Sequence, residues 1–385
     1  ATWDPDLEER IGEIIGYELR SKGGTLFGGV CINLLRHPAW GRAQETYGED
    51  PYLLGEMGAA LIRGVQKHAM ACAKHFALNS IENARFKVDV TISPRALHEI
   101  YLPHFKRAVD EGVAAIMSAY NSFNGEWCGQ NKTLLTDILK EQWGFDGFVL
   151  TDFIWGMRDA LKAALAGQDL EMPFQMHYHQ HLKELVESGQ VPLEKIDQAV
   201  SRLLRQQFRL LRSASYDPGR VGCENFRAVA REAAQKSIVL LQNEGSLLPL
   251  GGFQKIAVIG RLADMPNTGD DGSSNTRPAY VITPLQGLQT ALDGQAEVLF
   301  DDGTDLERAK KLAQQADVVL LVVGYDHKDE GEFLDQDTKA NLAKLYPTPR
   351  PDEVTLAREY MQSLGKESDG EFLSGGDRGS LTLHK

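Results

Sequence analysis

Cysteine is scarce in this chain, and the few cysteines are far apart. The 385 residues contain four, none of them in a CxxC pair. Disulfide frameworks and zinc sites need cysteines in pairs or clusters, so this sequence favours neither. Three of the four lie in or near apolar, strand-like segments, where a free thiol packs as a small hydrophobe. The four are Cys31, Cys72, Cys128 and Cys223.

Long apolar runs and an excess of basic residues are also missing. No run approaches the roughly 18 residues that span a bilayer. The 54 acidic and 41 basic residues give a formal net charge of −13, whereas nucleic-acid binding needs a basic surface. The N-terminus has no basic region followed by an apolar stretch, so no signal peptide is visible. This favours a cytoplasmic location, although residues 1–5 read like the interior of a longer chain.

The remaining composition is that of an ordinary globular protein, with 42% hydrophobic and 25% charged residues. Its length allows two or three domains. The first part, residues 1–212, alternates helix-like and strand-like segments. Repeated β-α order with short connections predicts an α/β fold with a parallel sheet and favours a (β/α) barrel. We expect helices over 4–23, 93–112 and 132–141, and strands over 25–33, 69–76, 114–121, 147–151 and 168–172.

A second, smaller domain is predicted after a linker rich in Ser, Pro and Gly at 213–224. Residues 225–385 contain a predicted helix over 228–242. They also contain apolar runs at 256–260 and 318–324, which predict the buried strands of an α/β sandwich. Residues 335–378 are polar and irregular, which predicts a surface excursion.

Asp152 ends an apolar run that begins at Gly147. The run predicts a strand buried on both faces. In a β/α barrel the carboxyl end of such a strand faces the active site, so an acid there is a catalytic candidate. The alternative is that Asp152 caps the next helix.

Other polar residues close neighbouring strands. Lys74 and His75 end the strand at 69–76, on the same rim as Asp152, unless the lysine reaches solvent beside a hydrogen-bonded histidine. Tyr120 ends the next strand, where its ring could pack on the rim or its hydroxyl could reach a carboxylate. Arg42 and Arg85 lie in loops, and loop charges usually face water.

Two loops of the second domain carry acids. Residues 325–332 contain four acids in eight residues, which is typical of a solvated turn. This loop follows a buried strand, so it could also reach across the domain interface. The loop at 269–274 is glycine-rich but lacks the GxxxxGK[ST] and GxGxxG spacings of nucleotide-binding loops.

These segments, in this order, resemble family 3 of the glycoside hydrolases. The resemblance covers nearly all of the chain and is most specific between Lys74 and Asp152. The matching pieces are Trp40-Gly41-Arg42 with Glu45, Glu49-Asp50-Pro51-Tyr52, Lys74-His75-Phe76, Met117-Ser118-Ala119-Tyr120-Asn121 with Asn124-Gly125, Trp143-Gly144-Phe145-Asp146-Gly147-Phe148 through Thr151-Asp152-Phe153, and Ser237-Ile238-Val239-Leu240-Leu241-Gln242-Asn243.

The resemblance implies the role of each candidate residue. Asp152 matches the nucleophile, in a motif more usually written Ser-Asp-Trp. The family places its acid/base in a variable loop of the second domain. Glu330, six residues after Gly324, matches that position, and Glu332 is the second choice. Five residues match positions that contact the sugar before the scissile bond: Arg42, Lys74, His75, Arg85 and Tyr120.

The implied activity is a retaining glycoside hydrolase that releases β-linked glucose from non-reducing ends, with no metal or organic cofactor. Its two carboxyl groups are expected about 5–5.5 Å apart. Its expected partners are small β-glucosides or oligosaccharides, and neither nucleic acid nor a membrane. Alternatives are an inactive fragment, a carbohydrate-binding protein, a β-xylosidase or a β-N-acetylglucosaminidase. The last of these usually carries a KHFPGHG-type signature, but here Lys74-His75-Phe76 continues as Ala77-Leu78-Asn79.

Two departures from the family pattern concern completeness. The family's barrel starts earlier and includes an acidic residue that binds outer sugar hydroxyls, which nothing in this chain matches. The second domain stops near Gly375-Gly376-Asp377-Arg378, where relatives continue. We therefore expect an incomplete barrel, and association with a second copy or with a complementary polypeptide segment.

Overall fold

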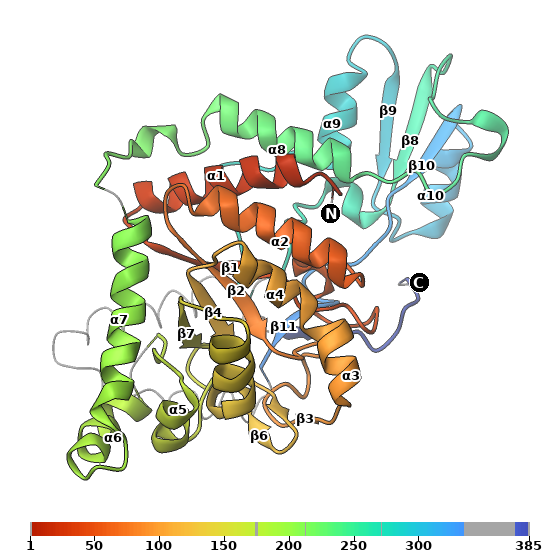
Figure 1. The fold of residues 1–385 in the computed structure, drawn as a ribbon. Coiled ribbons are helices and arrows are strands. Elements are labelled where there is room, and N and C mark those ends of the chain that lie inside the picture. Colours follow the sequence, from red (N-terminus) through yellow and green to blue (C-terminus); the bar gives the residue numbers. More distant parts are fainter. Residues whose placement is uncertain (1, 174–175, 212, 271, 335–373, 384–385) are drawn as a thin grey trace.

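A computed structural model describes residues 2–173, 176–211, 213–270, 272–334 and 374–383 (Figure 1). Most of the predicted irregular stretch at 335–378 lies outside these residues. Within the described ranges, no helix is long and apolar enough to cross a membrane.

A parallel sheet forms the core of the first domain, as predicted. Its strands are ordered β1-β2-β4-β7 in space, and Leu170 adds a parallel bridge to Leu150 at the β7 edge. Every residue of β2, β4 and β7 is buried, as expected of strands covered on both faces. The bounds are β1 (Leu26–Cys31), β2 (Met70–Phe76), β4 (Ala115–Ser118) and β7 (Phe148–Thr151).

Helices cover this sheet in the manner of a β/α barrel (Figure 1). Asp4 caps the first helix by accepting a hydrogen bond from the backbone N–H of Leu7 at 3.0 Å, and Pro5 follows as its first residue. The helices are α1 (Pro5–Ser21), α2 (Pro51–Val65), α3 (Pro94–Ala96), η2 (Leu97–Tyr101), α4 (Pro103–Asp110), η4 (Thr133–Gln142), α5 (Ala160–Ala166), α6 (His177–Glu187) and α7 (Leu193–Leu210).

The helix predicted over 93–112 is interrupted. Pro103 has no backbone N–H to donate back to the preceding turn, so α4 starts anew there. Short elements fill the loops that follow the strands: η1 (Ala43–Glu45), β3 (Asp89–Val90), β5 (Ser122–Phe123), β6 (Glu126–Trp127) and η3 (Cys128–Gln130).

The second domain contains a three-stranded parallel sheet in the order β10-β8-β9. The central and one outer strand match predicted runs, whereas the other outer strand, β9, was not predicted. Its elements are η6 (Glu244–Ser246), β8 (Lys255–Ile259), η7 (Arg261–Asp264), α9 (Pro284–Ala291), β9 (Glu297–Asp301), α10 (Leu306–Ala313) and β10 (Val318–Leu321).

Between the two sheets, η5 (Pro218–Arg220) precedes α8 (Glu224–Ser237). The predicted helix over 228–242 ends early, at Ser237, where an exposed run with two β-branched residues, Ile238 and Val239, begins. Helix α8 packs on α1, where Arg10 pairs with Glu232 at 2.9 Å. The proposed boundary between the domains remains a prediction.

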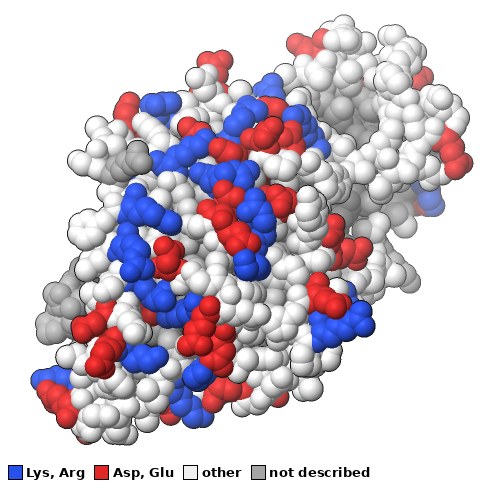
Figure 2. Space-filling view, in the orientation of Figure 1, with Lys and Arg blue, Asp and Glu red and all other residues white. Residues whose placement is uncertain are grey.

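A two-stranded antiparallel sheet connects the domains. It consists of β11 (Gly331–Phe333), which follows β10, and β12 (Ser374–Gly376). Lys and Arg interleave with Asp and Glu on the molecular face shown in Figure 2. Among the ion pairs of the first domain, Lys67 contacts Glu9 and Glu13 of α1, at 2.9 and 2.8 Å.

Helices α1 and α2 approach each other closely through glycines. A Cβ placed on Gly64 would lie 2.1 Å from the carbonyl oxygen of Glu9, and one on Gly12 would lie 2.5 Å from that of Leu61. Real Cβ atoms cannot come so near a backbone oxygen. The absence of side chains at these two positions therefore sets the distance between the helices.

Gly64→Ala should lower the free energy of unfolding by about 1–3 kcal/mol, because the helices must separate. Gly287→Ala is the matched control, since its Cβ would meet nothing nearer than 3.8 Å inside α9. The control should raise stability by about 0.5–1 kcal/mol through helix propensity. Urea unfolding followed by circular dichroism measures both. An unchanged or more stable Gly64→Ala protein would contradict the packing account.

Candidate functional site

Asp152 directly follows β7 and is buried. Its Oδ1 accepts a hydrogen bond from the backbone N–H of Phe153 at 2.8 Å. Its Oδ2 lies 3.6 Å from His75 Nε2 and has no hydrogen-bond partner. The cap of the next helix is Asp159, so the capping interpretation of Asp152 is wrong. Burial raises the pKa of Asp152, while the charges of Arg85, Arg42 and Lys74 lower it.

His75 is held in one orientation by Asn33. The Asn33 Oδ1 lies 2.8 Å from His75 Nδ1 and accepts a hydrogen bond from the His75 backbone N–H at 2.7 Å. Burial, aided by nearby Arg42 and Lys74, lowers the pKa of His75 well below its ordinary value, so the ring is neutral. The Asn33 oxygen favours the proton on Nδ1, which leaves Nε2 as an acceptor facing the Asp152 side. Asn33 was not predicted from the sequence.

Lys74, the neighbour of His75 in β2, is also buried. The alternative in which this lysine reaches solvent is therefore wrong. Tyr120 follows the packing alternative, and its hydroxyl reaches a backbone carbonyl instead of a carboxylate. Its ring packs 4.6 Å from that of Phe86, centroid to centroid, and its hydroxyl donates to the carbonyl oxygen of Phe153 at 2.7 Å, next to Asp152.

Arg42 and Arg85 are each only 1% exposed, although they lie in loops. The expectation that loop charges face water fails here because both guanidinium groups are paired. Arg42 makes a two-point contact with Glu45, at 2.7 and 2.8 Å. Arg85 pairs with Glu82 at 3.1 Å, and its guanidinium lies 5.0 Å from the centre of the Tyr120 ring.

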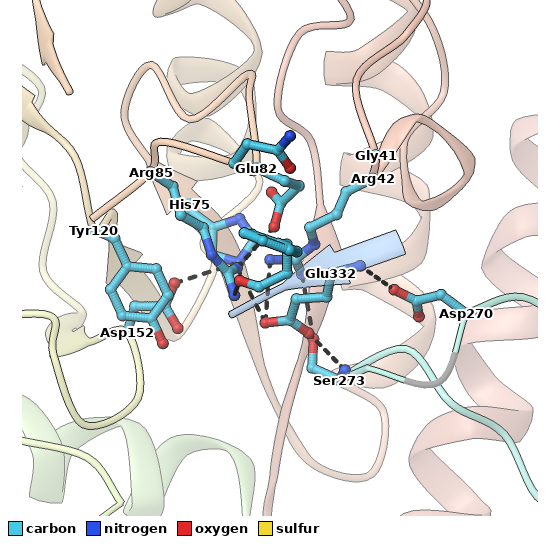
Figure 3. Close-up of polar contacts among 12 residues, drawn as sticks. Gly41, Arg42, His75, Glu82, Arg85, Tyr120, Asp152, Asp270, Ser273 and Glu332 are labelled. Atoms are coloured by element: carbon cyan, nitrogen blue, oxygen red, sulfur yellow. Dashed lines mark hydrogen bonds and ion pairs between the residues drawn. The ribbon is translucent and has the colours of Figure 1, made fainter. Parts of the chain in front are cut away.

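Glu332, from β11, bridges these two arginines (Figure 3). Its Oε1 lies 3.1 Å from Arg85 Nη1 and 3.7 Å from Arg42 Nη1. Its Oε2 accepts a hydrogen bond from the backbone N–H of Ser273 at 2.6 Å. Although burial opposes ionisation, the two arginines and Ser273 hold the pKa of Glu332 well below its usual range. Glu332 is therefore ionised and a poor proton donor at neutral pH, and its charge holds the two arginines in place.

The glycine-rich loop at 269–274 binds Glu332 through Asp270 and Ser273. The backbone N–H of Glu332 donates to Asp270 Oδ2 at 2.6 Å, while Ser273 binds the Glu332 side chain. Figure 3 shows Asp270 and Ser273 on one side of Glu332, and Asp152 and Tyr120 on the other. The loop thus holds a protein carboxylate in place.

Glu82 belongs to the site and was missed from the sequence. It is fully buried, between Arg85 and the Trp40 indole, whose Nε1 lies 3.3 Å from Glu82 Oε1. Burial raises its pKa to about 7. The signal in the sequence was its position three residues before Arg85 in the same loop.

Glu330, the preferred acid/base candidate, has a different environment from Glu332. It precedes β11 and pairs with Arg378 at 3.1 Å. Desolvation raises its pKa above the ordinary value. A carboxyl group with a raised pKa suits proton donation near neutral pH. The acidic loop therefore presents one carboxylate that stays ionised and one that retains its proton to higher pH.

Known metal-site patterns are not found in the part of the chain that the structure describes, where no cluster of three His, Cys, Asp or Glu could hold an ion. All four cysteines carry free thiols.

Curated relatives match most of this chain. Thermostable beta-glucosidase B of Acetivibrio thermocellus is 35% identical over 353 residues, which are 87% of this chain and 46% of the relative. An exo-alpha-(1->6)-L-arabinopyranosidase of Bifidobacterium breve is 34% identical over 366 residues, or 89% of this chain and 48% of the relative. The chain thus spans about half the length of these relatives.

Solved structures also match most of this chain. Beta-glucosidase 3B of Thermotoga neapolitana, solved in complex with glucose, has a TM-score of 0.76 and 30% identity, covering 94% of this chain and 55% of that one. DesR, a beta-glucosidase of Streptomyces venezuelae solved with D-glucose, has a TM-score of 0.74 and 32% identity, covering 79% and 41%.

Two family models divide the chain between them. The glycosyl hydrolase family 3 N terminal domain matches residues 1–206, and the glycosyl hydrolase family 3 C-terminal domain matches residues 238–347. The first covers more than half of the chain on its own. The chain belongs to glycosyl hydrolase family 3.

Proposed function

We propose that this chain carries the site of a retaining glycoside hydrolase that releases β-linked glucose from non-reducing ends. The observation that carries the proposal is the Asp152 carboxylate at the end of β7, with Oδ2 free of hydrogen-bond partners beside His75. Nearby cations favour the ionised form of this carboxylate, which is the nucleophilic form. Relatives named as beta-glucosidases support glucose as the sugar released.

The mechanism is double displacement. Asp152 Oδ2 attacks the anomeric carbon while Glu330 donates its proton to the departing oxygen, and a glycosyl-enzyme ester forms. Deprotonated Glu330 then takes a proton from water, which attacks the anomeric carbon and releases the sugar and Asp152. In the substrate complex we expect the two carboxyl groups about 5–5.5 Å apart.

The other site residues bind the sugar in this proposal. Neutral His75 presents Nε2 as an acceptor for a sugar hydroxyl, and Lys74 is a donor beside it. Arg42 and Arg85 provide positive charge near Asp152. Burial is the larger effect and raises the pKa of Asp152, and this positive charge limits that rise in favour of the ionised, nucleophilic form.

Asp152→Asn should lower kcat by several orders of magnitude, because an amide cannot form the covalent intermediate. Hydrolysis of aryl β-glucosides measures this. Asp305→Asn, which changes the cap of the distant helix α10, is the control and should retain the parent's rate. If the parent hydrolyses no aryl glucoside and Asp152→Asn binds glucose as the parent does, the carbohydrate-binding alternative is correct.

Glu330→Ala should slow substrates with poor leaving groups far more than activated aryl substrates, which need little protonation. Added azide should then speed turnover, because it attacks the glycosyl-enzyme without a base. Glu332→Ala tests the second choice in the same loop. If Glu332→Ala shows this leaving-group pattern and Glu330→Ala behaves like the parent, the assignment of Glu330 is wrong.

A pentopyranoside is the second candidate substrate. The Bifidobacterium relative is named for an α-L-arabinopyranoside, and its match covers 89% of this chain. A β-xyloside and a β-N-acetylglucosaminide remain alternatives within the family. Relative kcat/KM values across a panel of aryl glycosides distinguish these sugars from glucose.

We also propose that this chain associates, either with a second copy or with a complementary polypeptide segment. In the described residues β1 is an edge strand of its sheet. Large apolar side chains are exposed on α7 and in the run after α8: Leu193, Val200, Leu204, Phe208, Ile238, Val239, Leu240 and Leu241.

Light scattering on the purified chain should therefore give a mass above that of a monomer, since contiguous exposed apolar surface favours association. Electrophoresis of the same sample identifies any bound second polypeptide. A monodisperse, cooperatively unfolding monomer with nothing bound would contradict this proposal.

A further inference from the structure

Asp377 is not one of the proposed catalytic residues, yet its carboxylate accepts hydrogen bonds from backbone N–H groups of two distant loops. Oδ1 accepts hydrogen bonds from Gly41 at 2.9 Å and from Glu82 at 3.0 Å. Oδ2 accepts from Glu82 and from Asn83, both at 3.0 Å. These donors are 336, 295 and 294 residues away in sequence.

The two loops held in this way are those that carry the buried arginines. Gly41 immediately precedes Arg42, while Glu82 is itself the partner of Arg85. Asp377 thus fixes the backbone on which both guanidinium groups depend. Asp377 therefore affects the site through the backbone of these two loops. Among the described residues, its side chain forms no hydrogen bond with Asp152 or Glu332.

The residues around Asp377 fit closely against the same loops. A Cβ on Gly41 would lie 2.2 Å from the carbonyl oxygen of Gly376, so the two backbones are in contact. The Asp377 N–H donates to Asn83 Oδ1 at 2.9 Å, and the Arg378 N–H donates to the carbonyl oxygen of Ala39 at 2.8 Å. Arg378 also donates to the carbonyl oxygen of Pro38.

This docked segment also connects to the proposed acid/base. Arg378 pairs with Glu330 at 3.1 Å, and its guanidinium lies 4.2 Å from the centre of the Tyr325 ring. Gly375 packs so tightly that its Cβ would lie 2.6 Å from the backbone carbon of Glu330. The position of Glu330 therefore depends on where residues 375–378 dock.

We propose that Asp377 is a positioning residue, which fastens the β11–β12 sheet and Glu330 to the barrel loops that hold Arg42 and Arg85. This inference rests on the proposed function, because it assigns Asp377 a part in proton donation by Glu330. A carboxylate suits this task, since bonds from N–H groups to a charged acceptor are stronger than bonds to a neutral one. Asparagine has the same shape but only one acceptor oxygen.

The test compares Asp377→Asn with a matched control, Asp317→Asn. Asp317 also accepts two backbone N–H groups, from Gln254 at 2.8 Å and from Lys255 at 2.9 Å, in the second domain. Both variants and Glu330→Ala are measured in the full chain. The first readout is hydrogen exchange of peptides covering 39–45 and 80–86. The second is the dependence of kcat on leaving-group pKa across aryl β-glucosides.

Asp377→Asn should speed exchange in both peptides and lower kcat about tenfold or more for poor leaving groups, with little change for activated ones. Asp317→Asn should change neither readout. Unchanged exchange in both peptides would overturn the proposal. So would faster exchange with the parent's leaving-group dependence, provided that Glu330→Ala shows the steep one. If Glu330→Ala lacks that dependence, the assignment of Glu330 fails instead, and the exchange data alone decide whether Asp377 fastens the loops.

Discussion

The pairing of two buried guanidinium groups is the constraint on which the site depends. Removing a charge from water costs several kcal/mol unless partners replace the lost hydration. Arg42 and Arg85 are almost inaccessible to solvent, and their partners are Glu45, Glu82 and Glu332. The last of these comes from β11, beyond the sheet of the second domain. Burial of the arginines therefore requires that β11 and the loop at 269–274 lie against the barrel rim.

The same electrostatic cluster gives neighbouring carboxyl groups different properties. Two arginines and a backbone N–H keep Glu332 ionised, whereas burial dominates for Glu82 and raises its pKa to about 7. Glu330, two residues before Glu332, has its pKa raised by desolvation. Two carboxyl groups can take different roles in one site when their environments shift their pKa values away from each other. In the proposed mechanism Asp152 attacks, Glu330 transfers the proton and Glu332 holds the arginines in place.

Local patterns in the sequence were sufficient for the strands of the barrel and for the residues that end them. Asp152, Lys74 and His75 were predicted because each closes an apolar run, and such ends meet at one edge of a parallel sheet. The interruption at Pro103 was visible in the sequence but was outweighed by the apolar periodicity around it. Strand β9 has only three apolar residues between Glu297 and Asp301, so its apolar pattern was weaker than those of β8 and β10. The roles of Asn33 and Asp377 depend on partners far away in sequence, such as Glu82, which is 295 positions from Asp377, and no local pattern encodes them.

Covalent trapping tests the central claim, that Asp152 is the nucleophile of a retaining glycosidase, most directly. The chain is incubated with an activated 2-deoxy-2-fluoro-β-glucoside, whose fluorine slows breakdown of the glycosyl-enzyme, and the digested protein is examined by mass spectrometry. Our account predicts one sugar per chain, attached to the peptide that contains Asp152, and none in Asp152→Asn. Attachment to a different carboxylate, or turnover of natural substrate with no trapped ester and with inversion at the anomeric carbon, would contradict it.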